Sequence, residues 1–286
     1  MPELPEVETV RRGLVPLVGG GRILGVEMAR KDLRFAFPPD LAGIAGTRIE
    51  TIGRRAKYLL FMLSDGRVLL SHLGMTGAWR VEGTALAEPT RIHGNGRATG
   101  HDHLVLSFER DGQRARLVYN DPRRFGFVAL AAGPDAAPEL SGLGPEPLGN
   151  GFSSEHLAAA CAGRAAPIKS VLLDQRNVAG LGNIYVCEAL WRAGIAPTAA
   201  AGTLAPPRLA TLVAEIREVL TEAIAAGGST LRDFVGAEGS PGYFQHSFDV
   251  YGRAGEACRR PACTGTVARL VQSGRSSFFC PDCQSK

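Results

Sequence analysis

Four of the six cysteines lie within residues 258–286, and they constrain the fold of this chain more than any other feature. They form two closely spaced pairs separated by the length of a β-hairpin, Cys258-x4-Cys263 and Cys280-x2-Cys283. Paired thiolates in this pattern are typical of a tetrahedral zinc site. A module of this size cannot bury enough apolar surface to fold alone, so bound metal would provide its stability. The pattern therefore predicts one structural Zn²⁺ held by four cysteines.

Disulfide bonds are the alternative use of these cysteines, but they form in oxidising compartments. The N-terminus offers no apolar signal-peptide core, and no apolar run approaches the ~20 residues of a membrane span. Hydrophobic content of 45% and a mean hydropathy near zero are typical of a soluble globular protein. We therefore expect a cytoplasmic protein, in which Cys161 and Cys187 are buried thiols.

The positive charge of the chain is concentrated at its C-terminal end. The net charge is +4. Residues 250–286 hold six basic residues and two acidic ones, which also gives +4, so residues 1–249 sum to zero. This distribution is typical of an element that binds a polyanion, although terminal charges are often only solvated.

The chain begins Met1-Pro2-Glu3-Leu4-Pro5-Glu6, a segment that allows two interpretations. If Met1 is removed, Pro2 becomes the N-terminus and carries a free secondary amine. An α-amine ionises near pH ~8, against ~10.4 for lysine, so more of it is neutral at pH 7. Its attack on a carbonyl gives an iminium, an electron sink, and Glu3 could exchange the protons. The alternative is that the two prolines only start a helix.

The first half of the chain reads as one helix followed by strands. Apolar residues at helical spacing predict a helix at 3–17. Short alternating runs then predict a β-sandwich or barrel. The predicted strands are Arg22–Met28, Arg48–Ile52, Lys57–Leu63, Arg67–His72, Ala78–Val81, His103–Phe108, Arg116–Tyr119 and Phe127–Leu130. Residues 83–100 are rich in Gly, Thr and Pro and predict a long loop.

A Pro/Gly-rich linker at 133–151 marks the first domain boundary. Beyond it the pattern is helical, with predicted helices at 153–162, 167–174, from Asn183, and at 207–226. We expect four regions: a β-rich domain at 1–132, the linker, a helical domain at 152–240, and a zinc module at 241–286.

Three further segments could carry function, although each has a simpler interpretation. In Gly180–Tyr185, two glycines precede a predicted helix start, whose exposed amides attract phosphate. An ordinary tight turn would have a similar sequence. Asn120–Gly126 places adjacent arginines and a phenylalanine on a turn that could wedge between bases, or be a solvated turn. Arg54–Lys57 alone is most often a basic strand edge.

Eight segments, taken together, are far more specific than any one of them. In order they are MPELPEVETVRRGL (1–14), RRAKYLL (54–60), HLGMTG (72–77), DPRRFG (121–126), LGPEPL (143–148), NVAGLGNIYVCEAL (177–190), GGSTLRDF (227–234) and PGYFQHSFDVYGR (241–253). With the terminal cysteines, they resemble the bacterial formamidopyrimidine-DNA glycosylase (Fpg) family over essentially the whole chain. The resemblance implies an α+β multidomain protein: an N-terminal helix plus β-sandwich, a helix–two-turn–helix domain, and a C-terminal four-Cys zinc-finger β-hairpin.

The resemblance also implies a base-excision repair enzyme that flips an oxidised purine, such as 8-oxoguanine or a formamidopyrimidine, out of duplex DNA. Extrusion is required because the glycosidic carbon cannot be reached within the base stack. By this resemblance Pro2 attacks C1′ and forms the Schiff base, and Glu3 is the acid/base beside it. Lys57 would assist β-elimination and Arg275 would assist δ-elimination.

For DNA binding, the resemblance places Met75, Arg123 and Phe125 in the gap that the flipped nucleotide leaves. Arg123 would face the orphaned cytosine, and Phe125 would wedge the stack. The residues expected to contact phosphates are His101, Arg164, Lys169, Asn183 and Arg275. A loop from about Ser229 to Gly242 would cover the extruded base. The expected partner is double-stranded DNA with oxidised bases or abasic sites, bound by a monomer.

The chain departs from the family pattern in two places. Cys258 and Cys263 are two residues further apart than the commonest family spacing, and the loop at 83–100 looks long, which affects the alignment of His101. The nearest rival is a glycosylase of the endonuclease VIII type, but Leu4 and the intact DPRRFG favour the purine-directed type. A non-catalytic DNA-binding protein is the rival from another class, and it would not need an N-terminal amine.

Overall fold

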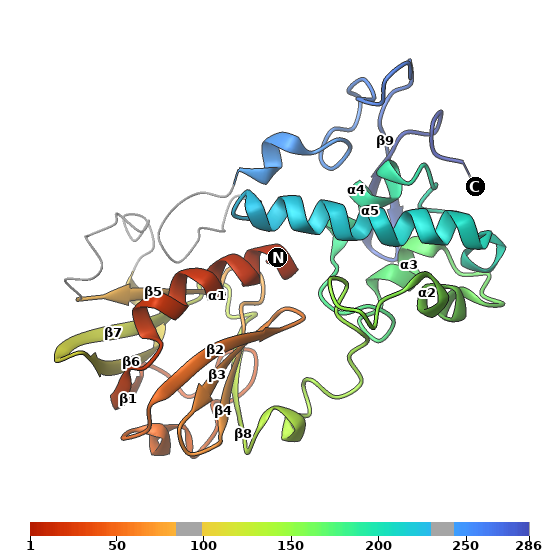
Figure 1. The fold of residues 1–286 in the computed structure, drawn as a ribbon. Coiled ribbons are helices and arrows are strands. Elements are labelled where there is room, and N and C mark those ends of the chain that lie inside the picture. The colour runs from red at the N-terminus through yellow and green to blue at the C-terminus, as the bar shows by residue number, and fades with distance from the viewer. Residues whose placement is uncertain (84–98, 230–242, 286) are drawn as a thin grey trace. The chain divides into compact units, whose positions relative to one another are not determined.

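The structure, a computed structural model, describes residues 1–83, 99–229 and 243–285 and divides into two compact units. The first unit comprises Met1–Ser141 and Ala226–Tyr243, and the second comprises Gly142–Ala225 and Phe244–Lys286 (Figure 1). Most of the loop predicted at 83–100 and of the cover predicted at 229–242 lies outside the described residues. Within the described part, no helix has the length and apolar character needed to cross a membrane.

Helix α1 spans Leu4–Val18 and confirms the helix predicted at 3–17. Glu3 is its N-cap residue, and Glu3 and Glu6 form a capping box, which gives orphan N–H groups of the first turn their acceptors. The residues of α1 that pack into the core of the first unit are Val7, Val10, Leu14 and Val18.

The described part of the first unit contains two four-stranded antiparallel sheets, with orders β1-β6-β7-β5 and β2-β3-β4-β8. One apolar cluster, formed by α1 and both sheets, includes Ile23, Phe61 and Leu117. This arrangement confirms the predicted β-sandwich. The strands are β1 Arg22–Met28, β2 Ile49–Arg55, β3 Tyr58–Leu63, β4 Val68–His72, β5 Ala78–Glu82, β6 Asp102–Arg110, β7 Gln113–Asn120 and β8 Phe127–Ala131.

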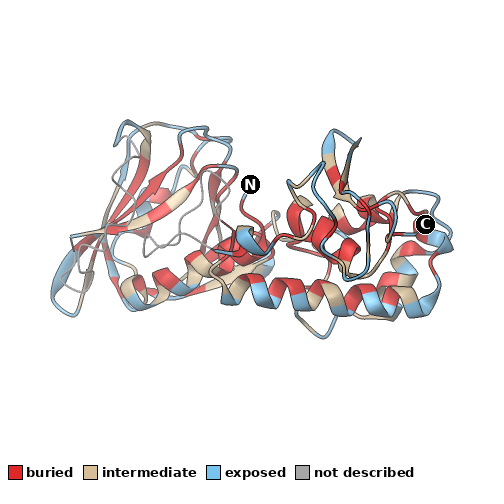
Figure 2. Cartoon of the chain, turned by 90° about the horizontal axis from the view of Figure 1, so that it is seen from above, coloured by how far each residue is buried: buried red, intermediate tan, exposed pale blue. Residues whose placement is uncertain are grey.

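The second unit is helical, as predicted, and ends in a hairpin. Its elements are α2 Ser154–Cys161, α3 Ile168–Leu173, α4 Asn183–Arg192, α5 Pro206–Ala225, β9 Ala268–Gln272 and β10 Arg275–Phe279. Ser153 caps α2 by accepting a hydrogen bond from the N–H of His156. Along α5, buried residues alternate with exposed ones at helical spacing (Figure 2). Short 3-10 turns occur at Leu41–Ile44, Thr99–His101, Pro134–Ala136, Ala201–Thr203 and Phe244–Ser247.

The buried Glu188 of α4 joins this helix to the segment that precedes the zinc module. Its carboxylate accepts hydrogen bonds from the backbone N–H groups of Asp249, Val250 and Tyr251, at 2.8 to 3.1 Å. Burial raises the pKa of Glu188, although these three N–H donors act in the opposite direction. The turn at 249–251 is therefore held against α4 by side-chain hydrogen bonds.

Glu8 joins α1 to the hairpin of β2 and β3 through Arg54, and it also binds Arg11 and Arg12 of its own helix. Its Oε1 accepts hydrogen bonds from Arg11 at 2.7 Å and Arg12 at 2.9 Å, and its Oε2 accepts one from Arg54 at 3.2 Å. Burial alone would raise the pKa of Glu8, but the hydrogen bonds and charges of these arginines lower it to about 2.

We predict that Glu8→Gln removes a pH-dependent part of the stability. The folded-state pKa of about 2 lies below the ordinary value of 4.5, so the stabilisation is complete above pH 4.5 and is lost as the pH falls toward 2. We expect on the order of 2 kcal/mol at neutral pH, because two of the arginines are partly exposed. Urea unfolding at about pH 7 and at about pH 3 gives the free energy of unfolding at each pH. Between the two pH values this free energy should fall less in the variant than in the wild type. An equal loss would contradict this assignment.

Candidate active site and DNA interface

The start of the chain is held in place before helix α1 begins. Pro2 is buried, Glu3 is 3% exposed, and Met1 is half exposed. The N–H of Glu3 donates a 2.8 Å hydrogen bond to Oε2 of Glu6, and the Glu3 carboxylate accepts from the N–H of Glu6. The segment is therefore both a helix start and a fixed chain end, so the two sequence interpretations are compatible.

The second oxygen of Glu6 fixes a segment that is distant in sequence. Its Oε1 accepts two hydrogen bonds of 2.9 Å, from the N–H and the hydroxyl of Ser229. Gly228, with φ +79°, packs so closely that a Cβ there would lie 3.2 Å from the Glu6 side chain. The sequence analysis did not single out Glu6. Its position three residues after the N-cap is a sequence signal for the capping box. No sequence signal indicates its contact with Ser229.

Lys57 lies in the turn between β2 and β3 and is 7% exposed. Ala56 has a φ of +51°, and its carbonyl accepts a 2.9 Å hydrogen bond from Arg54, which supports this turn. His72 of β4 is paired with Tyr58 in the sheet, next to Lys57. Burial, together with the charges of Lys57 and Arg34, lowers the pKa of His72 to about 4, so its imidazole is neutral at pH 7.

Four of the predicted DNA contacts come together on the first unit. The N–H of Arg123 donates to the hydroxyl of Thr76, the neighbour of Met75, at 3.2 Å. The Arg123 guanidinium lies over the Phe125 ring, 5.1 Å from its centroid. His101 accepts at its carbonyl a 3.0 Å hydrogen bond from the N–H of Asp121. Arg123 and the large apolar side chains of Met75 and Phe125 are exposed, as a surface that enters DNA requires.

Three other predicted residues come together on the second unit. Lys169 of α3 and Asn183 of α4 donate to the same carbonyl, that of Ser276, at 3.0 and 2.9 Å. Arg275, the residue before this carbonyl, is exposed and lines a cavity of about 320 Å³ together with Lys169. Lys169 is only 1% exposed and also donates to the Ser277 hydroxyl at 2.6 Å.

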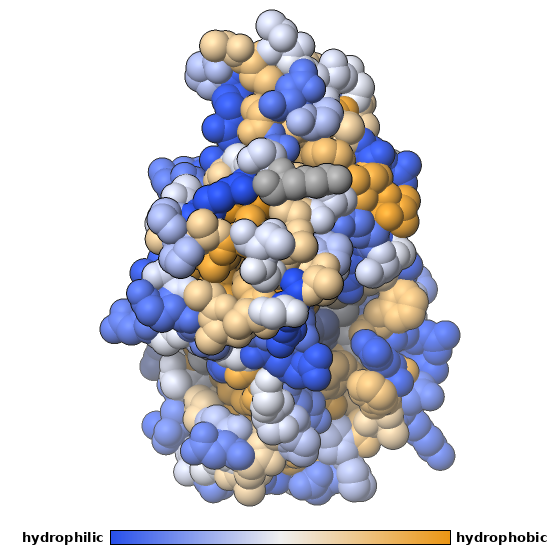
Figure 3. All heavy atoms as spheres, turned by 90° about the vertical axis from the view of Figure 1, so that its right-hand side faces the viewer, coloured by the Kyte–Doolittle hydropathy of each residue, from blue (hydrophilic) through white to orange (hydrophobic). Residues whose placement is uncertain are grey.

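Two further residues complete the description of this surface. Arg164 follows α2 and is exposed, and no hydrogen bond joins its side chain to the group around Ser276 within the described residues. The sequence analysis did not single out Tyr251, whose hydroxyl lies 3.4 Å from Nδ2 of Asn183. The face shown in Figure 3 is largely hydrophilic, with hydrophobic side chains in separate small patches.

The four terminal cysteines form a cluster that fits zinc. All four sulfur atoms lie within 4.8 Å of one another, and the Cys258–Cys283 and Cys263–Cys280 pairs are 3.7 Å apart. A tetrahedron with Zn–S bonds of about 2.3 Å places its sulfurs about 3.8 Å apart. Burial raises the pKa of the Cys258 thiol, but N–H donors from Arg260 and Trp191 outweigh it and lower the pKa to about 7. The donor set and the spacing therefore suit one structural Zn²⁺.

Arg260, between the first pair of ligands, makes contacts with α4. Arg260 lies over the Trp191 ring, 4.9 Å from its centroid, and donates to the carbonyls of Trp191 and Arg192 at the end of α4. The Trp191 indole donates to Sγ of Cys258 at 3.3 Å. The C-x4-C spacing thus keeps all four ligands together, and Arg260 within it places a cation at a helix C-terminus, where a positive charge is favourable.

Comparison with known protein families matches most of the chain. Three family models match it in order: the formamidopyrimidine-DNA glycosylase N-terminal domain at residues 1–128, the formamidopyrimidine-DNA glycosylase H2TH domain at 143–235, and the zinc finger found in FPG and IleRS at 255–286. Together they define a zinc-finger protein with a glycosylase-type N-terminal domain and a helix–two-turn–helix domain.

Relatives and solved structures agree with these matches over their full length. The formamidopyrimidine-DNA glycosylases of Rhizobium etli and Brucella ovis are 54% and 55% identical, over 99% and 100% of this chain and all of those proteins. A Lactococcus lactis FPG mutant in complex with Fapy-dG-containing DNA has a TM-score of 0.86 at 35% identity, covering 100% of both chains. The MutM (FPG) protein of Thermus thermophilus has a TM-score of 0.84 at 41% identity, covering 99% of this chain and 98% of that one. The chain belongs to the formamidopyrimidine-DNA glycosylase family.

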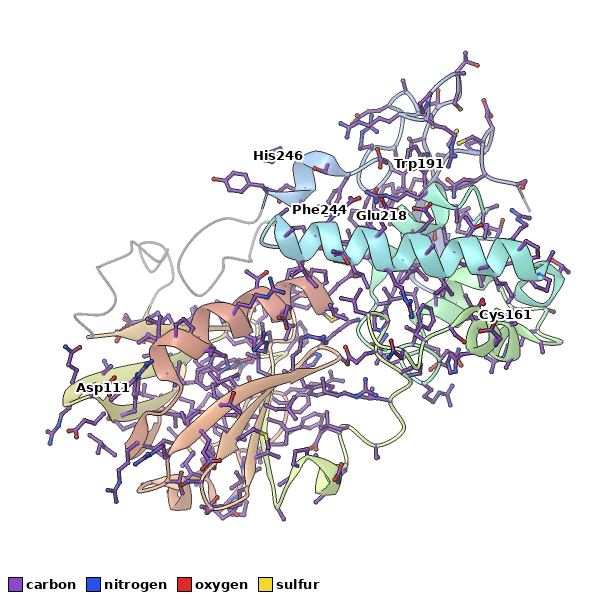
Figure 4. The ribbon with its side chains drawn as sticks, in the orientation of Figure 1. Asp111, Cys161, Trp191, Glu218, Phe244 and His246 are labelled. Carbon is purple, nitrogen blue, oxygen red and sulfur yellow. The ribbon has the colours of Figure 1, made fainter. Side chains whose placement is uncertain are left out.

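We predict that Cys263→Ser strongly reduces zinc binding, whereas Cys161→Ser keeps one zinc per chain. Cys161 is a buried thiol on α2 outside the sulfur cluster, which makes it a matched control (Figure 4). Loss of the metal should also change the fluorescence of Trp191, because its indole contacts a ligand. Metal analysis of the purified proteins measures the first effect and emission spectra measure the second. Full zinc content in Cys263→Ser would show that the cluster is not the metal site.

Proposed function

We propose that Pro2 is the nucleophile of this DNA glycosylase and AP lyase, which excises oxidised purines such as 8-oxoguanine and formamidopyrimidines from duplex DNA. The observation that carries the proposal is the fixed start of the chain: Pro2 is buried directly before Glu3, whose N–H is held by Glu6. Removal of the half-exposed Met1 frees the Pro2 nitrogen. A secondary amine at this position forms a fixed cation when it becomes an iminium.

The proposed chemistry begins when the Pro2 nitrogen forms a bond to C1′ and the bond from C1′ to the damaged base breaks. Glu3 exchanges the protons that base departure and opening of the sugar ring require. The resulting iminium withdraws electrons from the sugar, which permits elimination of the 3′ phosphate and then of the 5′ phosphate. Lys57 assists the first elimination and Arg275 the second. One nucleophile thereby supports both base removal and strand cleavage.

Recognition of the damaged site requires that the nucleotide leaves the stack, and the space it leaves has to be filled. We assign this to the exposed Met75, Arg123 and Phe125. Phe125 wedges between neighbouring bases, and Met75 fills volume. The Arg123 guanidinium donates hydrogen bonds to the cytosine that has lost its partner.

Phosphate binding is assigned to cationic and amide groups on both units. His101, Arg164, Lys169, Asn183 and Arg275 form this set, and the Tyr251 hydroxyl adds to it beside Asn183. Lys169 contributes its charge from behind the carbonyl of Ser276, because its side chain is buried there. The N-terminal amides of α4, which follow the glycine turn at 180–182, favour an anion.

Two observations separate this function from its rivals. The full-length relatives are named for formamidopyrimidine, and Leu4 and DPRRFG also favour purine lesions over the pyrimidine lesions of the endonuclease VIII type. A protein that only binds DNA would not need an N-terminal amine. Since its substrate is DNA, the enzyme works at the nucleoid, in the cytoplasm.

We predict that borohydride traps the wild type covalently on a duplex with 8-oxoguanine opposite cytosine, and that Pro2→Gly lowers this trapping by roughly 100-fold or more, the size usual for a lost catalytic group. Glycine leaves a primary amine, whose imine can lose its proton and become a weaker electron sink. Pro5→Ala, which changes a helix-start proline without an amine role, is the matched control. Intact-mass measurement verifies that Met1 is absent in each protein. Tight DNA binding without any adduct would contradict the proposal.

We predict that Arg123→Ala erodes the preference for cytosine opposite the lesion by roughly 5- to 150-fold, which corresponds to about 1–3 kcal/mol. Arg124→Ala is the matched control, because Arg124 is its exposed neighbour. Excision rates from duplexes with 8-oxoguanine opposite cytosine and opposite adenine give the ratio. An unchanged ratio in Arg123→Ala would remove Arg123 from its assigned role.

A further inference from the structure

A buried pair, Thr76 and Asp121, connects the two loops that carry the gap-filling residues. Thr76 is 6% exposed and Asp121 is fully buried. The Thr76 hydroxyl donates to Oδ1 of Asp121 at 2.5 Å and accepts from the N–H of Arg123 at 3.2 Å. The other carboxylate oxygen of Asp121 accepts from the N–H of Gly126 at 2.8 Å. Both ends of the loop that carries Arg123 and Phe125 are therefore bound to one small polar group.

The two loops also approach each other too closely to admit side chains between them. A Cβ at Gly74 would lie 2.3 Å from the backbone of Phe125 and Gly126, and the backbone of Gly74 has a φ of +61°. A Cβ at Gly126 would lie 1.9 Å from the hydroxyl of Tyr119. The loops thus form a single packed body, and the register between them is set by Thr76 and Asp121.

The chemistry of this pair is unusual for a site that only adds stability. Within the described residues Asp121 forms no ion pair, and the partners of its carboxylate are a hydroxyl and a backbone N–H. Burying a carboxylate with neutral partners alone is costly. Such costs are expected where a site requires fixed geometry.

We infer that Thr76 and Asp121 are positioning residues that determine how strictly the enzyme reads the base opposite the lesion. They hold Arg123 at a fixed distance from Met75. The Met75 side chain can then fill the gap while the Arg123 side chain contacts the opposite base. This inference rests on the roles proposed above for Met75, Arg123 and Phe125. Neither Thr76 nor Asp121 contacts DNA in this account, because both are buried.

The first test compares Thr76→Val with Thr76→Ser. Valine keeps the shape and removes the hydroxyl, whereas serine keeps the hydroxyl. In Thr76→Val, the ratio of excision opposite cytosine to excision opposite adenine should fall roughly three- to tenfold, the size of one lost hydrogen bond. Trapping on single-stranded abasic DNA, which has no opposite base, should fall by a smaller factor. Thr76→Ser should keep the wild-type ratio.

Two outcomes would overturn the inference. One is an unchanged ratio in Thr76→Val. The other is an equal loss on every substrate with a lower melting temperature, which is the result of a merely structural role. The double variant Arg123→Ala/Thr76→Val separates the role of Thr76 from the role of Arg123. If Thr76 acts through Arg123, adding Thr76→Val to Arg123→Ala should change the ratio little further. If Arg123→Ala alone leaves the ratio unchanged, the proposed role of Arg123 fails, whatever Thr76→Val does.

Discussion

A chain end that is to perform the chemistry proposed for Pro2 has to be kept from fraying, and termini are usually the least ordered part of a domain. Here the Glu6 carboxylate meets this constraint. One of its oxygens binds the N–H of Glu3, and the other binds Ser229 from the far end of the first unit. Glu8, two residues further along, joins the same helix to the hairpin that carries Lys57. Glu6 thus holds the chain start to the segment at Ser229, and Glu8 holds α1 to the sandwich.

A related arrangement lies behind the exposed groups that we propose to meet DNA. The buried Thr76 and Asp121 bind the loop of Arg123, and the buried Lys169 and half-buried Asn183 bind the carbonyl of Ser276 in the hairpin of Arg275. Buried hydrogen bonds in a low-dielectric interior are strong and directional, so they fix backbone positions better than exposed contacts do. The exposed side chains remain free to adapt to the nucleic acid.

Local features of this fold were predictable from sequence, and distant side-chain pairs were not. Hydrophobic periodicity located α1, the strands of the sandwich and α5, and cysteine spacing located the metal cluster. The contact of Glu6 with Ser229 joins segments more than two hundred residues apart, for which spacing carries no information. Likewise, nothing in the sequence around Lys169 indicates that its ammonium group is buried against Ser276. The roles proposed for the catalytic and gap-filling residues follow only from the family resemblance.

The wide interval between Cys258 and Cys263 has a consequence for how this module can change. A tetrahedral metal ion fixes four sulfur positions, and it tolerates more than one interval between the members of a ligand pair. In this interval Arg260 binds the end of α4, so the interval attaches the metal site to the helix as well as supplying its ligands. The neighbouring Pro261 is exposed. A short peptide label inserted beside Pro261 should therefore disturb α4 less than one inserted at Arg260.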